Sequence, residues 1–517
     1  MEIQFPFTFT NAILLLSFIF FFIYKGYRKS RNTTAKLPPS PWKLPLIGHL
    51  HHIGKLPHRS FQKLSEKHGP LMHVMLGEVT AIVVSSPALA KQVLKAHDPT
   101  FADRPVTIAG EILWYNSSNI SFSQYGDYWR QMRKICILEL LSAKNVKSFS
   151  SIRNDEVSQL IESIKISSST VDLTEKIFGM TSSITCRAAF GKVCKDKDQL
   201  IGMFKEGITL VSGFDVSDLY PSSKMLKALS CNRMRLMKMR LKLDLILDDV
   251  IDEHRRNLEK IVFADEENSE RRGNGEFGNE DLVDVLLRVK ESGELEFPIS
   301  DDNIKAVIYD IFAAGTETSS TTIDWIMAEL IRNPRVMSKL QTEIRETFKD
   351  NPNFGESDVQ KLKYLKLVIK EGFRLHAPIP LIPRVSRADT EIEGYVIPIG
   401  AKVLVNAWAM GRDPGLWSDP ERFEPERFEN DPRDFTGNDF EYIPFGAGRR
   451  MCPGMTFGLA SVELPLAHLL YSFDWKLPAG MSSGDLDMTE RPAITAARRQ
   501  NLELVATPYI YDGGFSL

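Results

Sequence analysis

Cysteine is scarce in this sequence, and no two cysteines are spaced as a metal-binding pair would be. Five occur among 517 residues, at Cys136, Cys186, Cys194, Cys231 and Cys452. An odd number at wide spacing argues against a disulfide framework and is typical of a protein in a reducing compartment. Because no CxxC pair occurs, a zinc site is not expected.

An excess of one charge, internal repeats and flexible linkers are lacking as well. The formal net charge is −3, so no strongly basic balance points to nucleic acid as a partner. No repeat and no Gly/Ser-rich linker divides the chain, so we expect one large domain, although length alone suggests roughly three. Hydrophobic residues (43%) and charged residues (25%) occur at ordinary globular levels.

The N-terminal region contains a long stretch without charge. Phe5–Tyr24 is rich in Phe, Leu and Ile, and about twenty such residues allow a helix to cross ~30 Å of hydrocarbon. Basic residues follow at once, which predicts that the body of the protein lies in the cytosol. A cleaved signal peptide has the opposite order, with basic residues before the apolar core, so an uncleaved single-pass anchor is favoured. The basic residues are Lys25, Arg28, Lys29, Arg31 and Lys36.

Prolines follow this stretch. The segment LPPSPWKLPLIGHL begins at Leu37, and its prolines stiffen the backbone and prevent a helix from continuing. We therefore divide the chain into a membrane anchor at 1–24, a basic stop and proline-rich hinge at 25–45, and one folded domain at 46–517.

The folded domain is predicted to be mainly α with a small β region. Alternating residues over 71–84 predict two strands around a turn at Gly77, and the pattern from Pro87 onward is mainly helical. Short apolar runs between Gly, Pro and Gly predict a second strand region over 391–405. Residues 263–280 are polar and glycine-bearing, which predicts a surface loop.

The sequence FGAGRRMCPG, from Phe445 to Gly454, places one cysteine in a glycine-rich loop just before a helical pattern. Helix N-terminal amides and nearby cations lower a thiol pKa, so Cys452 is a candidate thiolate for a soft metal centre, with haem iron as the leading possibility. Arg450 could then pair with a haem propionate. The alternative, a buried structural cysteine in a turn, explains less of the ten-residue pattern.

This loop resembles the haem-binding loop of the cytochrome P-450 monooxygenases, FxxGxRxCxG. All fixed positions match, at Phe445, Gly448, Arg450, Cys452 and Gly454. The resemblance extends through nearly the whole chain and is greatest to plant A-type members that oxidise terpenes. It implies the cytochrome P-450 fold, a single haem-thiolate catalytic domain behind the anchor, and haem b with Cys452 as the iron ligand.

A long helix predicted over 304–332 contains Gly315 followed by a run of Thr and Ser. Such residues are poor in a helix interior, so the run predicts either a bulge at a functional site or two helices with Thr318 or Ser319 as an N-cap. The resemblance identifies AGTETS as the acid–alcohol motif. It implies that Thr318 hydrogen-bonds the oxygen that reacts and that Glu317 helps relay protons from solvent.

Two further motifs supply charged groups. Glu371 and Arg374 lie at i,i+3 spacing, and the resemblance joins them to Arg427 in a buried structural triad. Trp129 and Arg133 lie one helical turn apart, where the indole N–H and the guanidinium could both donate to haem propionates. The resemblance adds Arg384 and Arg450 to this group, and for any single arginine the alternative is a solvated surface charge.

By position in the family, four segments should line a compact, largely apolar substrate pocket. For any one of these residues, an ordinary core role is an equally good interpretation. The residues are Val106, Ile108, Ile112, Trp114, Ile308, Ile311, Phe312, Ala313, Ile379, Leu381, Ile382, Ile494 and Thr495.

The resulting hypothesis is an O2- and NADPH-dependent monooxygenase of the endoplasmic reticulum membrane that hydroxylates a mono-, sesqui- or diterpene in plant specialised metabolism. No nicotinamide or flavin motif occurs, so NADPH–cytochrome P-450 reductase is the expected partner, and Arg130, Lys134 and Arg449 are candidates for docking it. The alternatives are the same chemistry on an alkaloid or phenolic, a reductase-independent haem-thiolate isomerase or dehydratase, and a non-catalytic haem carrier.

Overall fold

The computed structural model describes residues 36–510 apart from 168–169, 194–196, 212–213, 265–279 and 294. The predicted anchor at 1–24, Cys194 and nearly all of the predicted loop at 263–280 lie outside the described residues. Within the described residues, no helix combines the length and the apolar character that crossing a bilayer requires.

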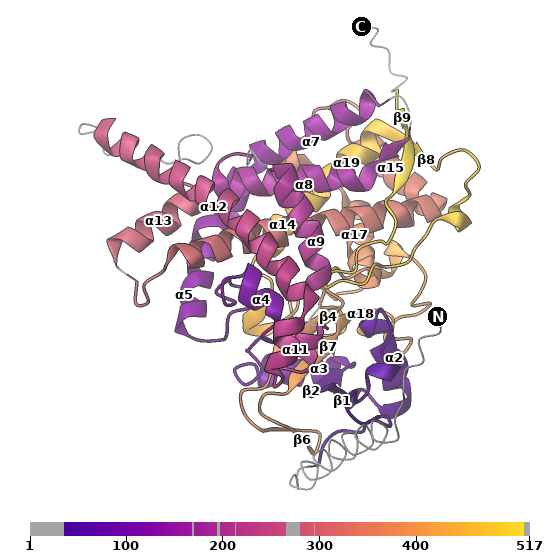
Figure 1. Ribbon diagram of the computed structural model, residues 1–517. Helices are drawn as coiled ribbons and strands as arrows, with labels where there is room; N and C mark the ends of the chain where they lie inside the picture. Colours follow the sequence, from indigo (N-terminus) through magenta and orange to yellow (C-terminus); the bar gives the residue numbers. More distant parts are fainter. Residues whose placement is uncertain are drawn as a thin grey trace, which may run out of the picture.

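Helices make up most of the fold (Figure 1). Their bounds are α2 (Pro57–His68), α3 (Pro87–Lys91), α4 (Ile108–Leu113), α5 (Asp127–Cys136), α6 (Ala143–Ser148), α7 (Ser150–Lys165), α8 (Leu173–Phe190), α9 (Lys197–Leu210), α10 (Val216–Leu219), α11 (Lys224–Leu229), α12 (Cys231–Ala264), α13 (Leu282–Ser292), α14 (Asp301–Arg332), α15 (Pro334–Thr347), α16 (Glu356–Val359), α17 (Lys363–Leu375), α18 (Ala407–Met410) and α19 (Met455–Ser472). Short helical turns occur at η1 (Leu50–His52), η2 (Gln92–Ala96), η3 (Ile137–Leu141), η5 (Pro425–Phe428), η6 (Gly448–Arg450) and η7 (Ser483–Asp485).

Strands form three small sheets beside the helical bulk. The largest has the order β1 (Leu71–Leu76), β2 (Val79–Val84), β7 (Lys402–Asn406) and β4 (Leu381–Val385), with β2 and β7 parallel. A second joins β3 (Val171–Asp172), β9 (Glu503–Pro508) and β8 (Phe473–Lys476), and a third pairs β5 (Thr390–Ile392) with β6 (Tyr395–Ile397). The mainly helical architecture and both strand regions predicted from the sequence are confirmed, with the turn glycine Gly77 at φ 64°.

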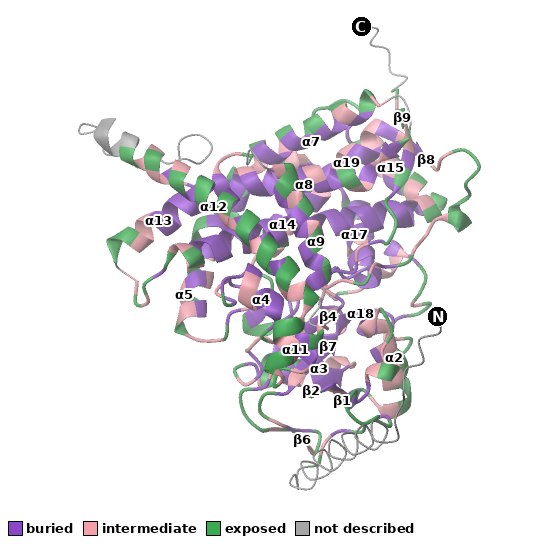
Figure 2. Cartoon of the chain, viewed as in Figure 1, coloured by how far each residue is buried: buried purple, intermediate pink, exposed green. Residues whose placement is uncertain are grey.

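The helix α14 runs through the centre of the molecule and is buried along most of its length (Figure 2). It packs against α8 and α19, and Ser300 and Asn303 form a capping box at its start. It is one continuous helix, so the alternative of two helices capped at Thr318 or Ser319 is wrong. A Cβ at Gly315 would lie 2.9 Å from the Thr185 hydroxyl, so this glycine lets α8 approach closely and offsets its poor helix propensity.

Candidate functional site

A cavity of about 330 Å³ lies between the Cys452 loop and the middle of α14. Cys452, Phe445 and Pro453 line one side, and Ala314 and Thr318 line the other. The two motifs singled out in the sequence, more than a hundred residues apart, therefore share one space.

The loop that carries Cys452 is held by its own backbone. The Cys452 N–H donates to the Phe445 carbonyl at 2.9 Å, and Gly446 and Gly448 both take positive φ values, of 71° and 70°. A Cβ at Gly448 would lie only 2.0 Å from the Leu94 carbonyl oxygen, so glycine is required where the loop meets η2. This geometry leaves the Cys452 side chain open to the cavity.

The environment of Cys452 combines opposing influences on its thiol. Burial raises the pKa of Cys452, while the Gly454 N–H and the charge of Arg133 lower it, and the net shift is upward. Both influences that lower the pKa were expected from the sequence, whereas the larger effect of burial depends on the packing around the loop. A thiolate at this depth needs a cation at the sulfur, which a metal centre supplies.

Arginines crowd one edge of the cavity: Arg104, Arg133 and Arg450 line it, and Arg384 of β4, which is not part of the lining, lies close enough to interact with their charges. Burial lowers the pKa of Arg384 well below its usual value, and the charges of Arg104, Arg450 and Arg133 lower it further. Burial, together with Arg104 and Arg133, also lowers the pKa of Arg450, to about 9. Among the described residues, Nε and Nη2 of Arg384 are buried without a hydrogen-bond partner. This surplus of buried positive charge and unused donors fits a ligand with anionic groups, as haem propionates are.

The other predicted propionate donors already have partners within the protein. The Trp129 indole N–H donates to the Ile120 carbonyl at 3.0 Å. Arg133 donates through Nη2 to the Met451 carbonyl at 2.6 Å, and Arg450 donates through Nε to the Ala102 carbonyl at 2.8 Å. A bond from the Trp129 indole to a propionate thus has to replace an existing one, whereas Arg384 has donors to spare.

Arg104 lines the cavity and was missed by the sequence reasoning. Its Nε donates to the Ser121 carbonyl at 3.0 Å, and its Nη1 bonds the Pro383 carbonyl. Arg104 lies in the irregular segment before α4, where no helical or strand spacing relates it to another motif. The sequence around it therefore does not distinguish it from a charge on the surface.

The acid–alcohol pair divides between two environments. Thr318 faces the cavity, and its hydroxyl donates to the Ala314 carbonyl at 2.7 Å, one turn back along α14. Glu317 is buried, and its Oε1 accepts hydrogen bonds from the Thr495 hydroxyl at 2.9 Å and from Nη2 of Arg491. The partners of Glu317 therefore come from the C-terminal part of the chain.

Whether a predicted pocket residue lines the cavity depends on the face of the helix or strand that it occupies. Ile308 and Phe312, one turn apart on α14, pack in the core and are not among the residues that line the cavity. Leu381 points to the face of β4 opposite Ile382 and packs elsewhere. Ile108 and Ile112 also belong to the core rather than the cavity wall, and Val106 is 57% exposed. The predicted residues that do line the cavity are Trp114, Ile311, Ala313, Ile379, Ile382, Ile494 and Thr495.

The wall also includes residues that the sequence reasoning did not name. The helices α8 and α9 contribute apolar side chains, and α14 contributes a carboxylate, Asp310. Burial raises the pKa of Asp310 to about 6, although the Ser121 N–H donates to it at 3.0 Å. The added apolar residues include Phe122, Ala188, Ala189, Phe204, Ile208 and Val211.

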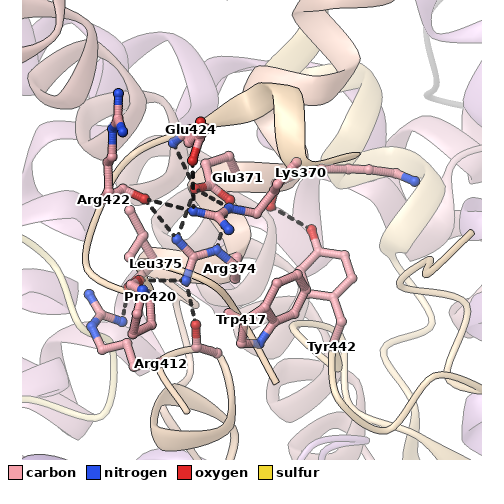
Figure 3. A network of polar contacts seen from close by, with 12 residues as sticks. Lys370, Glu371, Arg374, Leu375, Arg412, Trp417, Pro420, Arg422, Glu424 and Tyr442 are labelled. Carbon is pink, nitrogen blue, oxygen red and sulfur yellow. Dashed lines mark hydrogen bonds and ion pairs between the residues drawn. The ribbon is translucent and has the colours of Figure 1, made fainter. Parts of the chain in front are cut away.

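The residues of the charged triad are not part of the cavity lining. Figure 3 shows Glu371 and Arg374 facing each other within a network of polar contacts. Arg374 makes two hydrogen bonds to Glu371, at 2.7 and 2.8 Å, and Arg427 Nε reaches the same carboxylate at 3.0 Å. Arg374 also donates to the carbonyls of Gly411 at 2.6 Å and Pro420 at 2.7 Å. Glu371 and Arg374 thereby fasten α17 to the segment around η5, a contact with structural rather than chemical consequences.

Known proteins resemble this chain along nearly its whole length. The sequence model of the cytochrome P-450 family matches residues 38–502. A premnaspirodiene oxygenase from Hyoscyamus muticus is 55% identical over 506 residues, which is 97% of this chain and 98% of that protein. A 5-epiaristolochene 1,3-dihydroxylase from Nicotiana tabacum is 54% identical over 508 residues, with 97% and 98% covered. A solved zebra fish cytochrome P-450 with abiraterone aligns with a TM-score of 0.73 at 25% identity, covering 89% of this chain and 100% of that one.

Proposed function

This chain belongs to the cytochrome P-450 family, and we propose that it is the monooxygenase that hydroxylates a hydrophobic plant terpenoid. The family binds haem through a cysteine thiolate and uses O2 with electrons derived from NADPH. Two relatives that share more than half of the sequence are named for the oxidation of premnaspirodiene and of 5-epiaristolochene. A compact mono-, sesqui- or diterpene is therefore the substrate class that we assign.

The observation that carries this proposal is the shared cavity. Its walls beyond the arginine edge are mostly apolar, as a hydrocarbon-like substrate requires. Cys452 and Thr318 both line the cavity, so haem held by Cys452 and a substrate on the side of Thr318 would share it.

The residues of the cavity have distinct proposed tasks. Cys452 holds the haem iron, and Arg133, Arg384 and Arg450, with Arg104, neutralise the propionates. When bound, haem supplies the activation of O2. The apolar wall holds the substrate and excludes bulk water, which limits the loss of reducing equivalents to side reactions.

Proton supply is assigned to α14. The Thr318 hydroxyl lies in the cavity within one turn of the Ala314 carbonyl, so it can turn its proton toward the reacting oxygen by releasing that carbonyl. Glu317, next to it, is the carboxylate through which protons from solvent reach the site. Positioned proton donors of this kind contribute roughly 10²–10⁴-fold to rate.

The supply of electrons and the attachment to the membrane are assigned to parts of the chain outside the cavity. The exposed basic residues Arg130, Lys134 and Arg449 line a surface groove with Tyr125 and Trp129, and this groove is the proposed docking face for NADPH–cytochrome P-450 reductase. Residues 1–24 are proposed to anchor the protein in the endoplasmic reticulum membrane, with the catalytic domain in the cytosol.

The test is turnover by the full-length protein in microsomes with reductase. Premnaspirodiene, 5-epiaristolochene and a set of mono- and diterpenes are each supplied with NADPH, and products are identified by mass spectrometry. A product one oxygen heavier, formed only with both NADPH and reductase, is expected. Products from alkaloids or phenolics alone would replace the terpenoid assignment, and product without reductase would indicate an isomerase or dehydratase. No product from any compound would favour a haem carrier.

A further inference from the structure

The segment from Thr489 to Arg499 forms a hairpin that reaches the cavity. The Arg499 N–H donates to the Thr489 carbonyl at 2.8 Å, and the Arg491 N–H donates to the Ala497 carbonyl at 3.0 Å. The tip carries Ile494 and Thr495, which line the cavity wall. We call residues 489–499 the C-terminal hairpin.

Contacts on several sides fix the C-terminal hairpin in place. Ala496 donates through its N–H to the Pro378 carbonyl at 2.9 Å and accepts from the Trp325 indole at 2.6 Å. At its base, the Glu490 carboxylate accepts from His58 and Arg59 of α2, each at 2.9 Å. The hairpin therefore links α2, on the outside of the molecule, to α14 in its centre.

Two residues of this hairpin bracket one carboxylate oxygen of α14. Arg491 and Thr495, on opposite sides of the tip, both donate to Oε1 of Glu317. Only 3% of the Glu317 side chain is exposed, against 29% of the Arg491 side chain. Arg491 thus spans from the buried carboxylate to the protein surface, and Oε2 is the oxygen left for a donor or acceptor in the cavity.

We propose that Arg491 is a positioning residue for proton delivery, which orients Glu317 and gives this buried carboxylate its connection to solvent. The proposal rests on the proton-relay role assigned to Glu317 under the proposed function. Water at the exposed part of the Arg491 side chain is the source of the proton that reaches Glu317. Thr495 donates to the same oxygen of Glu317 and lines the cavity next to Ile494. A substrate packed against the hairpin tip therefore contacts a residue that also holds Glu317.

Arg491 is expected to matter because Glu317 is a buried carboxylate whose charge it balances. A buried carboxylate that loses its one cationic partner is left uncompensated, which is strongly unfavourable. The side chain then turns away or draws in water, and either response disturbs the path by which protons arrive. Arg491→Lys keeps the charge but loses the planar fork, so it restores the position only in part.

The first experiment measures coupling between the two side chains without turnover. Thermal midpoints of the full-length haem protein are compared for Arg491→Gln, Glu317→Gln and the double variant. Arg491→Gln is expected to lower the midpoint by on the order of 3 °C. Its effect should largely disappear when Glu317 is already Gln. Equal effects in both backgrounds would show that the two side chains are not paired, and would overturn the proposal. Arg499→Gln, which removes the same charge from an exposed position on the same hairpin, is the matched control.

The second experiment tests the proton path itself. Arg491→Gln is expected to lower product formed per NADPH by about fivefold and to raise the solvent deuterium isotope effect on product formation, while Arg491→Lys recovers part of both and Arg499→Gln changes neither. A purely structural role would lower the midpoint and leave the isotope effect unchanged, which would contradict the proposal. If no terpenoid is a substrate, NADPH consumption and peroxide release still report on Arg491, so failure of the substrate assignment can be told apart from failure of this inference.

Discussion

Thr318 and Glu317 are neighbours in sequence and both line the cavity, yet their side chains have different partners. The Thr318 hydroxyl stays within α14 and faces the cavity, whereas the Glu317 carboxylate is held by the C-terminal hairpin. Two successive helical residues project about 100° apart, so one can serve the reacting oxygen while the other communicates with the surface.

Thr318→Ala removes the cavity hydroxyl together with the γ-methyl group. We expect product formed per NADPH to fall by roughly 10²-fold, the lower end of what a positioned proton donor contributes, while the carbon monoxide difference spectrum is retained. Thr318→Ser keeps the hydroxyl and should retain most of the coupling. Equal loss in both variants would indicate that the methyl group, and thus packing, is what matters at this position.

Residues of short motifs could be assigned to one site from the sequence, and their chemical roles stay predictions. Cys452, Glu317 and Thr318 were all identified from contiguous patterns, and the structure brings them to one cavity. Residues that depend on three-dimensional direction were not. Ile308 and Ile311 look equivalent in sequence, but a difference of three positions turns Ile308 toward the core and Ile311 toward the cavity.

At the scale of elements, the Glu371 carboxylate joins α17 to the segment around η5. Glu371→Gln leaves Arg374, whose side chain is 0% exposed, without its counter-charge. We expect a loss of ~3–5 kcal/mol in the free energy of unfolding, seen as little or no folded haem protein on expression. The control is Arg335→Gln, which breaks an ion pair with Glu426 at a site where the Arg335 side chain is 58% exposed, and should cost only ~0–1 kcal/mol.

A second junction, between α12 and α13, depends on a buried histidine. His254 lies 2.9 Å from the Asp281 carboxylate, and Asp281 in turn caps the start of α13 together with Asp284. Burial by itself would lower the pKa of His254, but the hydrogen bond and charge of Asp281 outweigh it, so the pKa is raised above 6.5. Protonated His254 therefore stabilises the junction.

The sign of the shift fixes the direction of the pH dependence. Because the folded pKa lies above the unfolded value of 6.5, this stabilisation is complete below pH 6.5 and is lost as the pH rises through the folded pKa. We expect the thermal midpoint to fall over that range, and the fall to be smaller in His254→Gln. His51→Gln, at an exposed position, is the control, and an identical pH profile for wild type and His254→Gln would contradict the assignment.

The bounds of an element could be predicted from the sequence where its apolar residues recur at helical spacing. The long helix predicted over 304–332 is α14, extended to Asp301 by a capping box that the sequence reasoning had not used. The Gly and Thr run inside it predicted a bulge or a break, but the helix continues because α8 packs against Gly315 and compensates for the low propensity. Helix propensity depends on the local sequence alone, so it does not predict tertiary packing of this kind.

At the scale of the whole molecule, the basic groove beside α5 is where the proposed reductase would dock. Reversing two exposed charges, in Lys134→Glu with Arg449→Glu, should raise the reductase concentration needed for half-maximal turnover by about tenfold at low salt. The difference should shrink as salt screens the charges. Lys63→Glu, on α2, is the control, and an unchanged reductase requirement with an intact carbon monoxide spectrum would place the docking face elsewhere.

The parallel pairing of Ala81 in β2 with Lys402 in β7 has a consequence for how the protein is made. Most of the chain lies between these partners, so the contact order of this sheet is high, and β2 leaves the ribosome long before the strand that completes it. Arg384 sits on β4, which pairs with β7, and Cys452 is synthesised later still. The residues of the proposed cofactor cradle are therefore among the last parts of the fold that the nascent chain can bring together.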